Sequence, residues 1–265
     1  MSIDVISQIC VYCDYPLWRK MIQDNRDKFS KVILYPSKQH GVVDLEDFWL
    51  SQFPETWVKR EPIDYGVTDW RQGETEPLIK ESDAEWLWFM EADFFVSDWP
   101  KFFKDMEEAM KTSDMIGCWS PSQFPYMHPC CLLMRRSLFD KTNKDFRAHP
   151  EILGSDHFAM LTRDAERLEA KITTLEDLGY KEWEDYFHLG GLTYAYQDWK
   201  GSSTHFGMKN VEAYYVYLHH AAKADIVQSP KYLAQSNEIE KVLKSKYPNL
   251  DLENNKWTKF FTNTQ

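Results

Sequence analysis

The chain has 265 residues, which is enough for one large domain or two small ones with a hydrophobic core. Hydrophobic residues make up 43% and charged residues 28%, which excludes collagen-like, low-complexity and wholly disordered proteins. A formal charge of −11 excludes a protein whose whole surface binds nucleic-acid phosphates, but it leaves room for a local basic groove.

The apolar patterns predict strands and helices that alternate along the first half of the chain. Strands are expected at residues 3–13, 32–35 and 86–90, and helices at residues 17–29, 44–53, 76–80 and 100–110. Later elements are expected as strands at 115–119, 130–134 and 172–175 and as helices at 156–168 and 239–247. Strands that are buried on both faces and joined by helices predict an α/β fold with a mostly parallel central sheet flanked by helices.

An acidic motif follows the strand expected at residues 86–90. The sequence WLWFMEADFF runs from an apolar strand directly into Glu91 and Asp93. Ligands of open α/β sheets bind beyond the carboxyl ends of the strands, and two carboxylates there suit Mg²⁺ or Mn²⁺. The alternative is that both are solvated turn residues after a core strand.

This motif resembles the acidic DxD site of GT-A-fold, nucleotide-sugar-dependent glycosyltransferases of the family 2 type, with Glu91 in place of the usual first Asp. The upstream stretch WRQGETEPLIKESDAEWLWFM is similar to the segment of that family that precedes the site. The resemblance implies that Arg71 lies near the donor phosphates or base and that Asp14 contacts the nucleoside. A surface arginine is the alternative for Arg71.

Two later stretches extend the resemblance. EILGSDHFAML is similar to the segment that carries the general base of inverting members, which implies this role for Asp156, although Ser155 replaces the usual first acid. Asp156 as an ordinary helix-capping residue is the alternative. DYFHLGGLTYAY is similar to a segment whose histidine completes the cation site. It implies that His188 is a metal ligand.

Glycines and further histidines surround this last segment. Gly190 and Gly191 would let the backbone approach the donor closely. The other candidate metal ligands are His205 and the pair His219–His220. Sequence alone leaves the choice among these histidines open.

The resemblance implies a metal-dependent transferase that moves a sugar from a nucleotide-diphosphate sugar, expected to be a UDP-sugar, to a hydroxyl acceptor with inversion. The expected cofactor is Mn²⁺ or Mg²⁺. The catalytic domain is expected over residues 1–225, with a donor half at about 1–115, an acceptor half at about 116–225 and a C-terminal helical extension at 226–265. No Gly/Ser-rich linker or repeat divides the chain.

Two acceptor classes stay open, namely a glycan or lipid-linked precursor and a hydroxymethylated DNA base. The basic residues that would bind DNA phosphates are Arg135, Arg136, Lys141, Lys144 and Arg147. Two other functions also stay open. One is a non-catalytic carbohydrate- or protein-binding module on a degenerate GT-A fold, and the other is a sugar nucleotidyltransferase, although its Gly-rich loop is missing.

The cysteines and the N-terminus indicate the compartment. No charge-free run of 18 apolar residues occurs, and residues 1–16 hold an acid and no basic n-region, so we expect neither a membrane span nor a signal peptide. The five cysteines include a CxxC pair, Cys10 and Cys13, whose partners would be His128 and Cys130–Cys131. A second spaced pair is missing, which favours buried free thiols over zinc. We expect a soluble cytoplasmic protein.

Overall fold

The computed structural model describes most of the chain. The described residues are 2–10, 15–38, 46–52, 57–58, 63–64, 79–80, 82–120, 125–147, 157–189 and 211–262.

A central sheet of eight strands in the described part of the chain has the order β3-β2-β1-β5-β8-β7-β9, with β4 also paired to β2. Its strands are β1 (Ile3–Cys10), β2 (Lys31–Lys38), β3 (Trp57–Val58), β4 (Ile63–Asp64), β5 (Trp86–Glu91), β7 (Met115–Ser120), β8 (Tyr126–Arg135) and β9 (Ile172–Thr174). All pairings are parallel except those of β8, which is antiparallel to both β5 and β7. This confirms the predicted α/β fold with a mostly parallel sheet.

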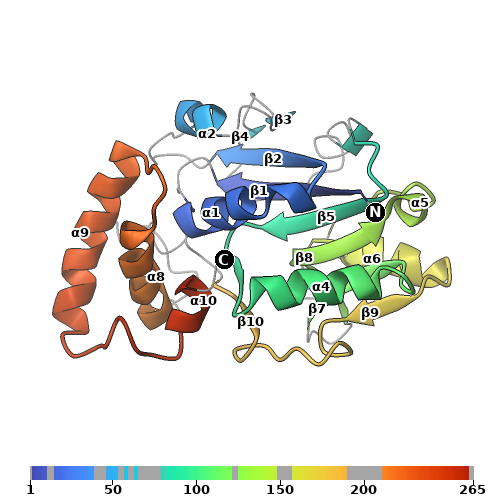
Figure 1. Ribbon diagram of the computed structural model, residues 1–265. Helices are drawn as coiled ribbons and strands as arrows, with labels where there is room; N and C mark the ends of the chain where they lie inside the picture. Colours follow the sequence, from blue (N-terminus) through green and yellow to red (C-terminus); the bar gives the residue numbers. More distant parts are fainter. Residues whose placement is uncertain are drawn as a thin grey trace.

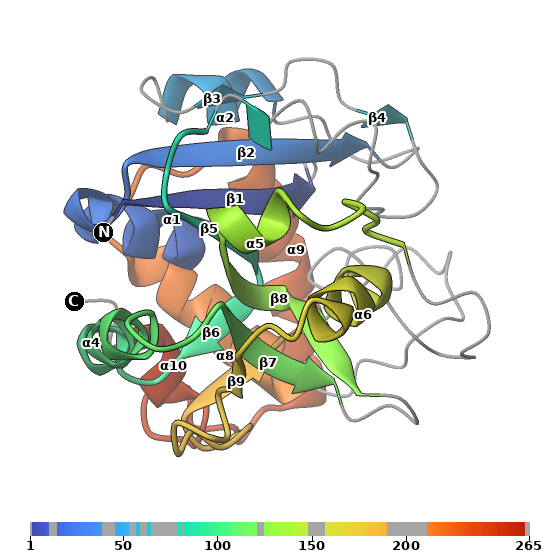
Figure 2. The ribbon, with the colours of Figure 1, turned by 90° about the vertical axis from the view of Figure 1, so that its right-hand side faces the viewer.

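Helices cover both faces of the sheet (Figures 1 and 2). The helices are α1 (Pro16–Asp24), α2 (Glu46–Gln52), α4 (Trp99–Ala109), α5 (Arg136–Phe139), α6 (Ala159–Arg167), α8 (Val211–Lys223), α9 (Pro230–Lys246) and α10 (Thr258–Thr262), with a 3₁₀ turn η1 (Arg26–Lys28). Helices α1 and α4 lie on one face, and α5 and α6 lie on the other. None of the helices in the described ranges is both long and apolar enough to cross a membrane.

Alternate residues of the central strands divide the core into two layers. Along β5, Trp88 and Met90 join the layer beneath α1 and α4, whereas Leu87 and Phe89 join the layer beneath α5 and α6. The side-chain period of two in a strand produces this division. Trp88 packs its ring 6.0 Å from that of Phe102 on α4, so part of the high aromatic content serves the core.

A buried carboxylate joins the starts of three strands. Asp4 on β1 is fully buried, and its Oδ1 accepts a hydrogen bond of 2.8 Å from the backbone N–H of Lys31 at the start of β2. Its Oδ2 accepts one of 2.5 Å from the hydroxyl of Ser82, which precedes β5. Because a buried carboxylate is stable only with such donors, Asp4 aligns the amino ends of β1, β2 and β5.

Several boundaries differ from the sequence prediction. The helix expected at 156–168 begins at Ala159, because Phe158 has a left-handed φ of 70° that ends helical geometry on its N-terminal side. The helix expected at 239–247 is longer and begins at Pro230, where Ser229 caps it. Two strands of three residues each, β6 (Phe94–Val96) and β10 (Tyr186–His188), were not predicted.

The pairing of β7 with β8 contains a wide irregularity. Gly117 pairs with Leu132 but Trp119 pairs with Met127, so one residue of β7 faces four residues of β8. A side chain at Gly117 would overlap the carbonyl oxygen of Cys131 and lie 3.1 Å from Cα of Leu132. Only glycine therefore fits at this position without movement of the β8 backbone.

We expect Gly117→Ala to lower the free energy of unfolding by about 1–3 kcal/mol, because the added methyl group displaces a buried backbone carbonyl. Urea denaturation measures the change. Gly179→Ala is the control, since Gly179 has a φ of 84° and nothing lies near its added Cβ, so it reports backbone strain alone. An unfolding free energy of Gly117→Ala equal to that of the wild type would contradict the close approach.

Candidate functional site

The two predicted acidic residues lie where β5 ends at the middle of the sheet. Glu91 is the last residue of β5, and Asp93 follows in the turn that leads into β6. Strand β6 pairs antiparallel with β10, with Phe94 opposite His188. The N–H of Leu189 also donates a hydrogen bond of 2.9 Å to the carbonyl oxygen of Asp93. This pairing brings the predicted histidine to the predicted carboxylates.

His188 contacts both carboxylates through one nitrogen. Its Nε2 lies 3.0 Å from Oε2 of Glu91 and 3.0 Å from Oδ1 of Asp93. The three side chains are between 15% and 27% exposed, so the group is mostly buried but still accessible to solvent. Their ligand atoms lie within 4.8 Å of one another, which is a suitable arrangement for one divalent cation.

The carboxylates change the protonation of His188. Burial alone lowers the pKa of this imidazole, but the charges and hydrogen bonds of Asp93 and Glu91 raise it well above its ordinary value. Without a cation, the ring is therefore held as an imidazolium between two carboxylates. A cation held by these three side chains would take the place of the proton as the positive charge of the group.

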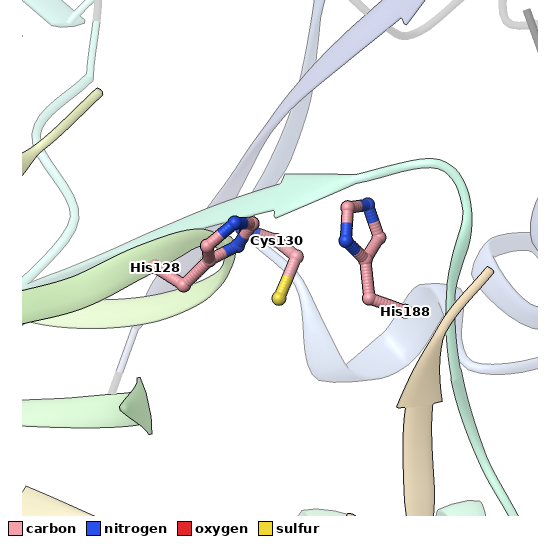
Figure 3. A group of neighbouring side chains, drawn as sticks. All are labelled: His128, Cys130 and His188. Atoms are coloured by element: carbon pink, nitrogen blue, oxygen red, sulfur yellow. The ribbon is translucent and has the colours of Figure 1, made fainter. Parts of the chain in front are cut away.

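A second group of possible ligands lies on the other side of His188. His128 and Cys130 come from β8, and their ligand atoms and one of His188 all lie within 4.8 Å of one another. Figure 3 shows the sulfur of Cys130 between the two imidazole rings. Residues 128 and 130 share a face of the strand because side chains alternate along it.

The environment of Cys130 makes its thiol acidic. Burial by itself raises the pKa of this thiol. The hydrogen bond from Cys118 and the charge and hydrogen bond of His128 act in the opposite direction and lower the pKa to about 6. Cys118, Cys130 and Cys131 are buried, and none of the three forms a disulfide.

The other predicted site residues fall into two sets. His219 and His220 do not join the site, because Nε2 of His219 lies 2.8 Å from Oε1 of Glu253 and that of His220 lies 3.1 Å from the carbonyl oxygen of Leu252. The predictions for the remaining residues lie outside the described part of the chain. These are Cys13, Asp14, Arg71, Asp156, Gly190, Gly191 and His205.

The three arginines among the basic residues expected to bind DNA phosphates have partners within the protein. Arg135 donates to Glu85 at 3.0 Å and to the carbonyl oxygen of Met110 at 2.8 Å. Arg135 also pairs with Trp86 at the start of β5, five residues from Glu91, which places it about 17 Å from the site along the strand.

Arg136 and Arg147 likewise donate hydrogen bonds to acceptors within the protein. Arg136 donates to Asp140 and to two backbone carbonyl oxygens, and Arg147 donates to both oxygens of Asp145. Together with Arg135, these arginines contribute to the fold, and their described contacts favour no phosphate-binding stripe beside the site.

His128 and Cys130 lie beside this site although their sequence pattern indicated only possible partners of the CxxC pair near the N-terminus. The H-x-C spacing was the available signal, because residues two apart on a strand share a face. What was missing was the register of β8 against β5, which pairs Cys131 with Met90 and so places Cys130 beside Glu91.

No protein-family profile matches the sequence. No curated protein matches it significantly. Solved structures with a similar fold include a mannosyltransferase from Pyrobaculum calidifontis in complex with GDP-Man and Mn²⁺, with 12% identity and a TM-score of 0.48 over 94% of this chain and 75% of that one.

Two further solved structures are also similar to this chain. Glucosyl-3-phosphoglycerate synthase from Mycobacterium tuberculosis, in complex with Mn²⁺, uridine diphosphate and phosphoglyceric acid, has 12% identity and a TM-score of 0.45 over 67% of this chain and 73% of that one. A 4-diphosphocytidyl-2C-methyl-D-erythritol synthase from Anaerococcus prevotii has 11% identity and a TM-score of 0.40 over 65% of this chain and 87% of that one.

The raised pKa of His188 predicts a pH-dependent stability of the metal-free protein. The charged ring contributes stability that is complete below its unfolded pKa of about 6.5 and is lost as the pH rises through the raised folded pKa. The difference in unfolding free energy between the wild type and His188→Gln should therefore shrink as the pH rises above about 6.5. Urea denaturation with a chelator present measures it, and a difference that grows with pH would contradict the raised pKa.

Proposed function

We propose that this protein is a metal-dependent glycosyltransferase that uses a nucleotide-diphosphate sugar as donor and a hydroxyl group as acceptor. The observation that supports this most is the convergence of Glu91, Asp93 and His188 at the carboxyl end of β5. These are the three residues that the GT-A resemblance implies for the cation site, and they come from segments 95 residues apart in the sequence.

The donor set fits a divalent cation and favours Mn²⁺ over Mg²⁺. Carboxylate oxygens suit both ions, but Mg²⁺ prefers an all-oxygen shell with several waters. Mn²⁺ accepts a mixed set in which an imidazole nitrogen is one ligand. Glu91 and Asp93 would supply one oxygen each, and His188 would supply Nε2 after losing its proton.

A bound cation supplies Lewis-acid stabilisation of the negative charge that develops on the departing nucleoside diphosphate. Glu91 and Asp93 hold that positive charge at the end of a rigid central strand, so the reacting groups are fixed relative to the sheet. The pairing of β6 with β10 fixes His188 in the same way. In the proposed inverting reaction, Asp156 takes the proton of the acceptor hydroxyl as it attacks the anomeric carbon.

The acceptor is proposed as a glycan or lipid-linked hydroxyl in preference to a hydroxymethylated DNA base. The preference rests on the three arginines of the expected basic stripe, whose described hydrogen bonds are to acceptors of the protein itself. A salt-dependent gel shift with duplex DNA would reverse this preference.

We expect Asp93→Asn to reduce sugar transfer by at least about 100-fold, because removing an electrostatic transition-state contact typically costs this much. The donor should lose its Mn²⁺-dependent binding while the far-ultraviolet circular dichroism spectrum stays unchanged. Asp83→Asn is the matched control, since the side chain of Asp83 is 97% exposed and is not one of the proposed cation ligands. Wild-type transfer by Asp93→Asn would contradict the proposed cation site.

A donor screen tests the proposed class itself. Thermal unfolding is measured with UDP-, GDP- and other nucleotide sugars, each with and without Mn²⁺. One donor should raise the melting temperature by several degrees only when Mn²⁺ is present, since a ligand that binds the folded state alone stabilises it. No response to any donor would favour a non-catalytic binding module, and a response to a nucleoside triphosphate with a sugar phosphate would favour a nucleotidyltransferase.

A further inference from the structure

His188 has two ring nitrogens, and the described structure places a different ligand group beside each of them. Nε2 faces the carboxylates of Glu91 and Asp93 at 3.0 Å. Nδ1 is therefore the nitrogen that remains for the second group, and Figure 3 shows a nitrogen of this ring on the side that faces Cys130. The two groups of side chains share one residue.

We propose that His128, the Cys130 thiolate and Nδ1 of His188 form a binding site for Zn²⁺ that excludes Mn²⁺ from the carboxylate group. One thiolate and two imidazoles are a soft donor set, which suits Zn²⁺ and disfavours Mg²⁺ and Mn²⁺. Three protein ligands leave the fourth position of a tetrahedral ion open to water or a substrate atom.

The distances are compatible with such an ion after small side-chain rotations. The three ligand atoms lie within 4.8 Å of one another. Tetrahedral Zn²⁺ with bonds of about 2.0–2.3 Å needs ligand atoms about 3.3–3.8 Å apart. Nδ1 of His128 accepts a hydrogen bond of 3.1 Å from the N–H of Cys130. Zn²⁺ would bind this nitrogen through the lone pair that accepts the hydrogen bond, and would replace that bond.

Neighbouring groups are placed to orient these ligands. When Zn²⁺ binds Nδ1 of His188, Nε2 carries the proton and donates it to Asp93 and Glu91 at the observed 3.0 Å. A carboxylate that accepts from the far nitrogen of a zinc-binding histidine is a common arrangement that fixes the ring and strengthens the ligand. The register of β7 on β8 passes from Leu132 to Met127 and so skips residues 128–131, although Cys131 stays paired with Met90 of β5.

The exclusion follows from the chemistry of the imidazole. A neutral ring has one lone pair in its plane, so as long as the ring keeps one proton, Zn²⁺ at Nδ1 leaves that proton on Nε2 and Mn²⁺ at Nε2 leaves it on Nδ1. The two ions therefore compete for His188 although their other ligands differ. This competition rests on the function proposed above, whereas Zn²⁺ binding by itself does not.

Cobalt spectroscopy tests the site without any sugar donor. Co²⁺ added to the metal-free wild type, kept reduced with a phosphine, should produce sulfur-to-metal charge-transfer absorption in the near ultraviolet that Zn²⁺ abolishes. Cys130→Ser should lose this band, and Cys131→Ser, a buried cysteine on the same strand, should keep it. Absence of the band in the wild type, or its persistence in Cys130→Ser, would overturn the proposal.

Two further variants keep the outcome clear if Cys130→Ser does not fold. His128→Gln, whose fold is checked by circular dichroism, should bind Zn²⁺ at least about tenfold more weakly in titration calorimetry. Mutation of a residue that merely hydrogen-bonds to a metal ligand already lowers metal affinity by about this factor. Unchanged Zn²⁺ affinity in His128→Gln would overturn the site. The double variant Glu91→Gln and Asp93→Asn should lose Mn²⁺ binding but keep the cobalt band, which separates failure of this proposal from failure of the proposed function.

Competition is measured by electron paramagnetic resonance of free Mn²⁺. Zn²⁺ at one equivalent should release bound Mn²⁺ from the wild type, whereas Cys130→Ser should need a higher Zn²⁺ concentration for the same release, because Zn²⁺ then competes only at the carboxylates. The same Zn²⁺ concentration for release from both proteins would place Zn²⁺ among the carboxylates and overturn the assignment to Cys130.

Discussion

The short antiparallel pairing of β6 with β10 is the interaction on which the candidate site depends. Three residue pairs, from Tyr186 opposite Val96 to His188 opposite Phe94, carry a histidine back to the end of β5. The pairing is held by rings on both strands, with Phe95 and Phe187 5.7 Å apart. Phe187 also packs 4.6 Å from Phe260 of α10, so the C-terminal helices support the strand that supplies His188.

The central sheet supplies the rigid half of the site. Strand β5 lies between β1 and β8, and both of its neighbours are paired along nearly its whole length. Its residues from Trp86 to Met90 are fully buried, and the chain becomes accessible only at Glu91. A carboxylate at the first accessible position of such a strand has little freedom to move, which is the property that a cation site requires.

Sequence could predict the acidic half of this site but not the whole of it. The uninterrupted apolar run before Glu91 marks a buried strand and its end, so Glu91 and Asp93 were located from local pattern alone. His188 was identified by resemblance, because a three-residue strand is too short to show a period. His128 and Cys130 depend on the register of β8 against β5, and no local pattern encodes a register between segments 40 residues apart.

The separation of the ligands along the chain has a consequence for synthesis on the ribosome. Asp93 is translated 95 residues before the histidine that joins it, and Glu91 is translated just before Asp93. Until β10 has emerged, β6 has no antiparallel partner, and two carboxylates stand at the end of the central strand without their imidazole. Cation binding through all three side chains therefore becomes available only late in translation, and it marks a chain that has folded beyond its first half.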